Sequence, residues 1–317
     1  MTLRVGLVGA GGVGARHARV LAGFDDVELV GVADSAPDTA TALATDLDVA
    51  VCTVDQLLAA GLDGIWLCVP PFAHGDLERR VIAAGVPFFV EKPIAADLVV
   101  AESVANLVAD AGLPTATGYH WRHLDTVTTA REVLAGSTPR LVHARWWGTT
   151  PPPAWWSDSA RSGGQLVEQA THVLDLVRLL AGEVTEVVGG SAASGSAGRD
   201  VPDATAAVLR MASGAVGSVS TSCVLPVLTA AGLEVVADDL VVSLTETTLD
   251  VRSRTVDEHT APSVDARDAV DRAFVDVLAG RPASPGLVDV AEALRTHRLA
   301  WALAESTRTG AVVRVAS

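Results

Sequence analysis

The sequence predicts an α/β protein: an N-terminal Rossmann dinucleotide-binding domain followed by a C-terminal α+β domain with an open, mostly antiparallel sheet. Short apolar runs alternate with helical patterns over roughly the first hundred residues, and a glycine-rich turn directly follows the first run. Near Gly118 the rhythm changes to longer strand patterns joined by tight turns. A chain of 317 residues is long enough for two domains. We therefore expect a NAD-binding domain over residues 1–117 and a substrate-binding and oligomerisation domain over residues 118–317.

The N-terminal domain alternates predicted strands and helices along the chain. This order implies a parallel sheet with right-handed crossover connections. The predicted strands span 3–8, 27–33, 64–69 and 87–90, and the predicted helices span 14–22, 37–46 and 74–84.

The C-terminal domain is predicted from period-two runs and tight turns. Ser213-Gly214 separates two such runs, which is typical of a hairpin. The predicted strands span 206–211, 215–224, 234–242 and 242–252, and the predicted helices span 164–180, 264–279 and 288–307.

Composition excludes several classes of partner. The 38 acidic and 23 basic residues give a net charge of -15, which repels nucleic acid and anionic lipid. No apolar run reaches the ~18 residues of a membrane span, so we expect no membrane partner. The three cysteines are Cys52, Cys68 and Cys223, an odd number without CxxC spacing. They argue against a disulfide framework and a cysteine metal site, and they favour a cytoplasmic location.

A dinucleotide site is predicted at the first glycine-rich turn. Gly9, Gly11 and Gly14 fit GxGxxG after a strand and at the start of a helix, and Asp34 follows at the end of the second strand. Glycines let backbone N–H groups approach a pyrophosphate, and the carboxylate accepts hydrogen bonds from a ribose diol. Because Asp34 repels a 2′-phosphate, we expect NAD to be preferred over NADP.

Lys92 is the only lysine in the chain. It follows Glu91 and precedes Pro93 at the end of a buried strand, at the edge where open α/β sheets bind ligands. The pKa of an amine can be lowered by burial, whereas arginine is effectively always protonated. We therefore expect Lys92 to be a catalytic residue.

A second candidate cluster lies on the predicted helix 164–180. Spacings of four and three place Glu168, His172 and Asp175 on one face. A histidine flanked by carboxylates can hold one tautomer and exchange a proton near neutral pH. The alternative interpretation is a solvent-exposed polar stripe.

Taken together, these motifs resemble the glucose-fructose oxidoreductase and inositol dehydrogenase family (Gfo/Idh/MocA). The resemblance spans the whole chain, including His17 after the glycine motif and the final helix from Asp289. Its further segments are Cys68–His74, Glu91-Lys92-Pro93, Gly118–Arg122 and the stretch from Gly163-Gly164 to His172-x-x-Asp175.

The resemblance implies roles for individual residues. Lys92 and His172 face the reacting carbon, and Glu91, Pro71 and His74 help to hold the cofactor. The Lys92–Pro93 bond is often cis in such proteins, and the open sheet usually mediates dimers or tetramers. Glu168 replaces a frequent Asp, and Ala170 and His120 also depart from the common pattern, which leaves the substrate open.

Aromatic side chains cluster where the second domain begins. We expect the substrate-binding residues to come from Tyr119, His120, Trp121, Arg122, Trp155 and Trp156. Rings there could stack on a sugar or cyclitol, and the alternative is core and interface packing. Trp146 and Trp147 are adjacent on one strand, so alternation sends one to each face.

The leading hypothesis is a NAD-dependent dehydrogenase or ketoreductase acting on a secondary alcohol of a sugar, sugar derivative or cyclitol, assembled as a homodimer or homotetramer. Lys92 or His172 accepts the hydroxyl proton, while Glu168 and Asp175 orient the substrate or the histidine. One alternative is a non-catalytic dinucleotide-dependent binding or regulatory protein. Another is a NAD-dependent glycosidase that cleaves its substrate through transient oxidation.

Overall fold

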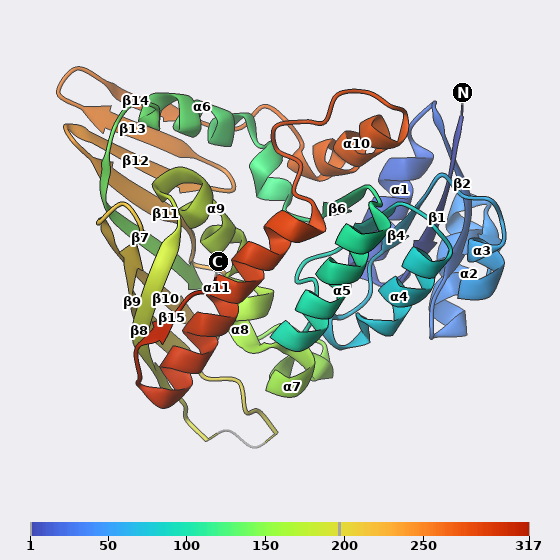
Figure 1. Ribbon diagram of the computed structural model, residues 1–317, viewed down its shortest axis with the longest axis horizontal. Helices are drawn as coiled ribbons and strands as arrows, with labels where there is room; N and C mark the ends of the chain where they lie inside the picture. The colour runs from blue at the N-terminus through green and yellow to red at the C-terminus, as the bar shows by residue number, and fades with distance from the viewer. Residues whose placement is uncertain (1, 196–197, 317) are drawn as a thin grey trace. The chain divides into compact units, whose positions relative to one another are not determined.

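The computed structural model describes residues 2–195 and 198–316, which divide into two compact units (Figure 1). The first unit contains residues 2–95, 99–120 and 266–293. The second contains residues 96–98, 121–195, 198–265 and 294–316. The chain thus returns to the first unit late in the sequence. The division at residues 117 and 118 stays a prediction.

The first unit is built on a six-stranded parallel sheet with the order β3-β2-β1-β4-β5-β6. Its strands are β1 (Leu3–Val8), β2 (Val27–Ala33), β3 (Ala50–Val51), β4 (Gly64–Leu67), β5 (Phe88–Val90) and β6 (Thr115–Thr117). Its helices are α1 (Gly12–Ala22), α2 (Pro37–Leu47), α3 (Val54–Leu58), α4 (Asp76–Ala83), α5 (Leu98–Ala111) and α10 (Ala266–Leu278). The strand order reverses between β1 and β4, the point where such sheets bind ligands at their carboxyl ends.

The late segment completes the core of the first unit. Phe274 of α10 is fully buried and packs edge-on against Trp66 of β4, with ring centroids 5.3 Å apart. Trp66 in turn stacks on Phe89 of β5 at 5.9 Å. Apolar strands such as β4 are buried on both faces, which explains their continuous hydrophobic sequence.

In the second unit, the described residues form a nine-stranded sheet with the order β14-β13-β12-β11-β7-β10-β9-β8-β15. Its strands are β7 (Pro139–Trp147), β8 (Val184–Ala192), β9 (Ala204–Met211), β10 (Val216–Ser222), β11 (Ala230–Ala237), β12 (Leu240–Thr245), β13 (Leu249–Ser253), β14 (Asp257–Thr260) and β15 (Val313–Arg314). Every neighbouring pair is antiparallel except β7 and β10, which are parallel. This is the mostly antiparallel sheet that the sequence predicts.

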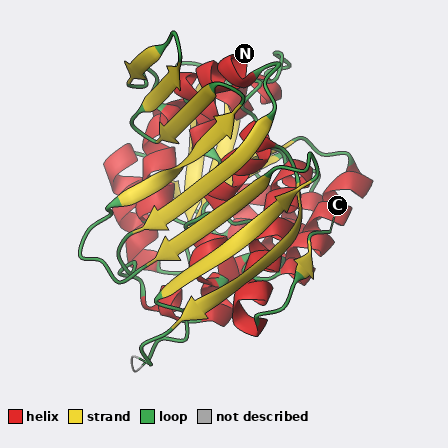
Figure 2. Cartoon of the chain, turned by 90° about the vertical axis from the view of Figure 1, so that its left-hand side faces the viewer, coloured by secondary structure: helices red, strands yellow, loops and turns green. Residues whose placement is uncertain are grey.

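One face of this sheet is open. Figure 2 shows that face, with no helix of the described part of the chain in front of its strands. On the other face lie α9 (Thr171–Ala181), which contacts β7 and β11, and α11 (Val290–Thr309), whose Ser306 bonds Gly189 of β8. The remaining helices are α6 (Asp125–Leu134), α7 (Ser159–Ser162), α8 (Gly164–Glu168) and the short turns η2 (His120–His123) and η3 (Ala154–Ser157).

Three predicted elements are wrong in their bounds. The helix expected over 164–180 is two helices, because the backbone changes course at Gln169 and Ala170 and both N–H groups donate to the Gln165 carbonyl. The strand expected over 234–242 ends at Ala237, where Asp239 adopts the left-handed conformation (φ 57°) and turns the chain into β12. The strand expected over 242–252 is likewise divided between β12 and β13.

None of the helices in the described ranges combines the length and the apolar composition that a membrane span requires.

Candidate active site

The glycine motif forms a narrow turn between β1 and α1. A side chain at Gly9 would collide with the Cys68 carbonyl, and one at Gly14 with the Gly9 carbonyl. Gly9 also has a φ of 98°, which favours glycine. Open space surrounds Gly11 and Gly12, where α1 begins and where no side chain caps the helix. This turn leaves the N-terminal N–H groups of α1 accessible to an anion such as a pyrophosphate.

Asp34 is tied to this turn by its carboxylate. One oxygen accepts the N–H of Ala10 and the other accepts the N–H of Ala36, both at 2.7 Å. A carboxylate oxygen can accept further hydrogen bonds, so Asp34 can still bind a ribose diol. Its negative charge disfavours a 2′-phosphate at the same position. The predicted residues Gly9, Gly11, Gly14 and Asp34 therefore lie together and fit a dinucleotide such as NAD.

The segment after β4 lies beside the same turn, because Cys68 contacts Gly9. Pro71 begins the short turn η1 (Pro71–Ala73), and His74 follows it. His74 is buried, and its Nδ1 lies 2.6 Å from Oε1 of Glu78. The buried Glu78 keeps a lowered pKa: burial raises it, but His74 and the Gly75 N–H outweigh that effect. Glu78 therefore holds the ring of His74 in one orientation.

Glu91 and Lys92 stand at the end of β5. The Glu91 carboxylate accepts the backbone N–H of Lys92 at 3.0 Å, and the Lys92–Pro93 bond is cis. Oε1 of Glu91 lies 2.8 Å from Nε2 of His17 and 3.6 Å from the Arg16 guanidinium. Glu91 is thus held by side chains of α1, and its carboxylate in turn holds the backbone N–H of Lys92.

In the second unit, His172 lies in a cluster of near-parallel rings. Its ring centroid is 5.7 Å from that of Trp121 and 6.1 Å from that of Trp146, and the two indoles are 5.9 Å apart. His172 is 5% exposed. The indoles restrict the plane of the imidazole.

Asp175 and Arg122 form a buried ion pair in the same unit. Two guanidinium nitrogens of Arg122 each donate to an Asp175 oxygen at 2.6 Å. The hydroxyl of Thr296 donates to Asp175 at 3.0 Å and accepts from Arg178 at 2.6 Å. This network connects η2, α9 and α11, so Asp175 fixes the framework around His172.

Glu168 ends α8 and accepts the indole N–H of Trp156 at 2.7 Å. Trp156 is fully buried against Val201 and Cys223, and Trp155 is partly buried beside it. Trp156 therefore packs inside the second unit, and its role as a substrate-binding residue stays a prediction. Glu168 is separated from the helix of His172 by the break at residues 169 and 170.

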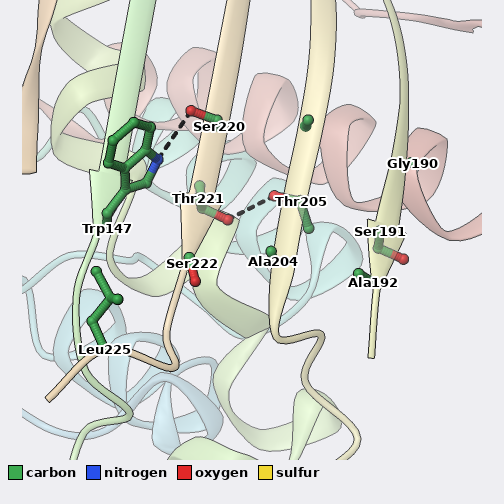
Figure 3. A pocket seen from close by; sticks show the side chains of 11 residues that line it. Trp147, Gly190, Ser191, Ala192, Ala204, Thr205, Ser220, Thr221, Ser222 and Leu225 are labelled. Atoms are coloured by element: carbon green, nitrogen blue, oxygen red, sulfur yellow. Dashed lines mark hydrogen bonds between the residues drawn. The ribbon is translucent and has the colours of Figure 1, made fainter. Parts of the chain in front are cut away.

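Alternation along β7 places Trp146 and Trp147 on opposite faces, as the sequence predicts. Trp147 is 37% exposed on the open face, and its Nε1 donates to Ser220 (Figure 3). It lines a shallow pocket formed by β7, β8, β9 and β10, where Thr205 and Thr221 bond each other at 2.6 Å. None of the predicted site residues lines this pocket.

Within the first unit, the structure gathers Gly9, Gly11, Gly14 and Asp34 at one turn and places Glu91 and Lys92 at the end of β5. Tyr119 and His120 follow β6 and are buried. Within the second, it gathers His172 with Trp121 and separately pairs Arg122 with Asp175.

Two residues that contact these groups were not expected: Trp146 beside His172, and Asp271, which pairs with His17 at 2.7 Å. Asp271 lies 254 positions after His17, so no local pattern could reveal the pair.

Comparisons with known proteins agree with this geometry. The profile of the GFO/IDH/MocA oxidoreductase family, NAD-binding Rossmann fold, matches residues 3–119. The GFO/IDH/MocA C-terminal domain profile matches residues 129–241.

Two curated relatives are dehydrogenases of inositols. An inositol 2-dehydrogenase of Rhizobium meliloti (strain 1021) is 32% identical over 232 residues, which are 70% of this chain and 69% of the relative. The scyllo-inositol 2-dehydrogenase (NAD(+)) of Bacillus subtilis (strain 168) is 27% identical over 197 residues, which are 59% of this chain and 56% of the relative.

A solved structure of levoglucosan dehydrogenase in complex with NADH has the same fold. Its TM-score is 0.89 at 19% identity, and the match covers 100% of both chains. The two profiles account for most of the sequence, and the inositol 2-dehydrogenase is 32% identical to this chain over more than two thirds of each protein. This protein therefore belongs to the GFO/IDH/MocA oxidoreductase family.

Proposed function

We propose that this protein is a NAD-dependent dehydrogenase that oxidises a secondary alcohol of a cyclitol, a sugar or a sugar derivative to the ketone. The observation that carries the proposal is the turn at Gly9–Gly14 with the anchored Asp34, in a chain whose family is NAD-binding. The substrate class follows from the relatives, which act on inositols.

The reaction needs a hydride acceptor and a proton acceptor. NAD supplies the hydride acceptor when it is bound. As the hydride leaves the carbinol carbon, the O–H bond breaks and its proton passes to a base on the protein. We assign that base to Lys92 or His172.

Lys92 suits this role because an amine both titrates and donates hydrogen bonds. Glu91 fixes its backbone at the carboxyl end of β5, where α/β sheets bind ligands. His172 suits it because the rings of Trp121 and Trp146 hold the imidazole plane.

We assign Glu168 and Asp175 a positioning role. Their carboxylates are bonded to Trp156 and to Arg122, so each shapes the wall around His172. The candidates for substrate contacts remain Tyr119, His120, Trp121, Arg122, Trp155 and Trp156. Glu91, Pro71 and His74 remain candidates for cofactor contacts.

The proposal is tested by incubating the purified protein with a panel of inositols, aldoses and polyols, with NAD or with NADP, and following the absorbance of the reduced cofactor. We expect turnover of at least one cyclitol or sugar with NAD. Turnover with NADP alone would contradict the role given to Asp34.

We also propose that the open face of the large sheet binds a second copy of this chain. Leu141 pairs with Val216 and Val188 pairs with Val208 across neighbouring strands, and all four are 39–51% exposed. Such an apolar patch, flanked by the ion pairs Arg145–Glu234 and Arg210–Glu186, suits a symmetric interface.

Light scattering tests the interface. We expect a dimer or tetramer, and we expect Val208→Glu to dissociate it, while Val99→Glu, at a 77% exposed position on α5, leaves it intact. A wild-type mass of 32.6 kDa at micromolar concentration would contradict the proposal.

The three cysteines are thiols, Cys52, Cys68 and Cys223, which is typical of proteins in a reducing compartment. We therefore propose a cytoplasmic location. A fusion to a fluorescent protein, observed in intact cells, tests it.

A further inference from the structure

A buried row of charged side chains connects α10, α1 and the end of β5 inside the first unit. His17 and Asp271 are 0% exposed and Glu91 is 7% exposed. Nδ1 of His17 lies 2.7 and 2.8 Å from the two oxygens of Asp271, and its Nε2 lies 2.8 Å from Oε1 of Glu91. The indole N–H of Trp66 also donates to Asp271, at 2.8 Å.

These contacts determine how many protons the His17 imidazole carries. A neutral imidazole has one N–H and cannot donate to two carboxylates at once. Asp271 and Glu91 both accept hydrogen bonds from N–H groups elsewhere, as ionised carboxylates do. A doubly protonated His17 satisfies every contact. Burial lowers the pKa of His17, but Asp271 and Glu91 outweigh it and raise this pKa to about 9.

Several groups face the Glu91 carboxylate. His17 and Arg16 approach from α1, Lys92 is its neighbour in the chain after β5, and Gly118 packs against it from the end of β6. The buried Cys68 thiol stays neutral, because burial and the charges of Glu91 and Asp271 raise its pKa. Burial raises the pKa of Glu91, and His17, Lys92 and Arg16 lower it further than burial raises it.

We propose that His17 and Asp271 are positioning residues for the reaction. Asp271 holds His17 as an imidazolium, and that charge keeps Glu91 ionised, so that its carboxylate fixes the Lys92 backbone and supplies the negative charge beside the Lys92 amine. The link to catalysis rests on the proposed function. The charge state of the row does not depend on it.

Substitution of His17 by a neutral residue removes the cation from Glu91 and leaves its burial unchanged. The pKa of Glu91 then rises, because an opposite charge at this distance shifts a carboxyl pKa by about 1–3 pH units. Below the new pKa, Glu91 is protonated. It then accepts the Lys92 N–H more weakly and no longer offsets the positive charge of the Lys92 amine.

NMR tests the charge of His17 in the wild-type protein. With histidine labelled with ¹⁵N, we expect both nitrogens of His17 to be protonated at pH 7 and to titrate near pH 9, and the signal is assigned by its absence in His17→Gln. Asp271→Asn should lower this midpoint by about 1–3 pH units. A neutral tautomer of His17 at pH 7 would overturn the proposal.

The lone lysine gives a second test that needs no substrate. Protein labelled with ¹⁵N-lysine shows one backbone amide signal, that of Lys92, whose N–H donates to Glu91. We expect the inflection of this signal to lie at a higher pH in His17→Gln than in the wild type, with Glu91→Gln marking the protonated limit. An inflection at the same pH in both proteins would refute the coupling of His17 to Glu91.

The pH profile of kcat/KM for an alcohol that the panel identifies then tests the catalytic role. In His17→Gln we expect the acidic limb to move up by about 1–3 pH units, with the loss in kcat rather than in KM. His259→Gln removes an exposed His–Asp pair on β14 and should leave the profile unchanged. Trp66→Phe removes a hydrogen bond to Asp271 without removing charge, and it should lower stability without moving the limb. An unmoved limb in His17→Gln would reject the positioning role, whereas absence of any oxidised alcohol would reject the proposed function.

Discussion

The ion pair between Arg122 and Asp175 gives the most quantitative prediction. Asp175→Asn removes the charge but keeps the size of the side chain, and it leaves Arg122, whose side chain is 7% exposed, without its bidentate partner. Removing one partner of a buried ion pair costs about 3–5 kcal/mol. With a urea slope of about 2 kcal/mol/M, the unfolding midpoint should fall by roughly 1.5–2.5 M.

The assay is urea unfolding of the purified protein followed by tryptophan fluorescence. Asp238→Asn is the matched control, because Asp238 binds Arg140 in the same bidentate way but both side chains are more than 60% exposed. We expect no measurable change for this control. If Asp175→Asn unfolded at the wild-type midpoint while activity fell by two orders of magnitude, Asp175 would act on the reaction and the structural role would be wrong.

Three further predictions concern the reaction and the cofactor site. Lys92→Arg retains the charge but removes the compact titratable amine, so turnover should collapse while NAD affinity measured by calorimetry survives; near-normal turnover would leave His172 as the base. Asp34→Ser should reduce the preference for NAD over NADP by roughly tenfold or more in kcat/KM, since it removes the carboxylate that repels the 2′-phosphate, and an unchanged ratio would show that another residue sets the preference. Because folding raises the pKa of His17, its protonation stabilises the fold. This stabilisation is complete below the unfolded pKa near 6.5 and is lost as the pH rises through about 9. The urea midpoint should therefore fall over that window by an amount equivalent to about 3 kcal/mol, and it should depend less on pH in His17→Gln.

The Rossmann domain could be predicted in detail because its signals are local. The strand patterns at Leu3–Val8 and Val27–Ala33 match the observed strands residue for residue. The glycine motif and Asp34 also lie where their spacing predicts, because a tight turn and a sheet edge leave few alternatives. The elements β3, α3, α5 and β6 were not predicted.

The second unit was harder because its decisive contacts are distant in sequence. The break after Glu168 depends on side-chain bonds of Gln165 to Gln169 and to the carbonyl of Ser222 on β10. The turn after Ala237 has no glycine, and Asp239 takes the left-handed conformation instead. Helical spacing alone therefore predicted one face for Glu168, His172 and Asp175, and the structure gives each carboxylate a different partner.

The membership of α10 in the first unit could not be predicted either. Its sequence indicates an amphipathic helix but not the sheet that it covers. Phe274 and Asp271 show the reason: they contact Trp66 and His17, more than 200 positions earlier in the chain.

The product balance of a single reaction distinguishes an alcohol dehydrogenase from a glycosidase that oxidises its substrate only transiently. The purified protein is incubated with NAD and an inositol or sugar from the panel, and NADH, ketone and any released aglycone are quantified together. We expect one NADH and one ketone for each alcohol consumed, with both products lost in Lys92→Arg. Cleavage of a glycoside without net NADH, or no oxidation of any alcohol above the rate without protein, would contradict this expectation.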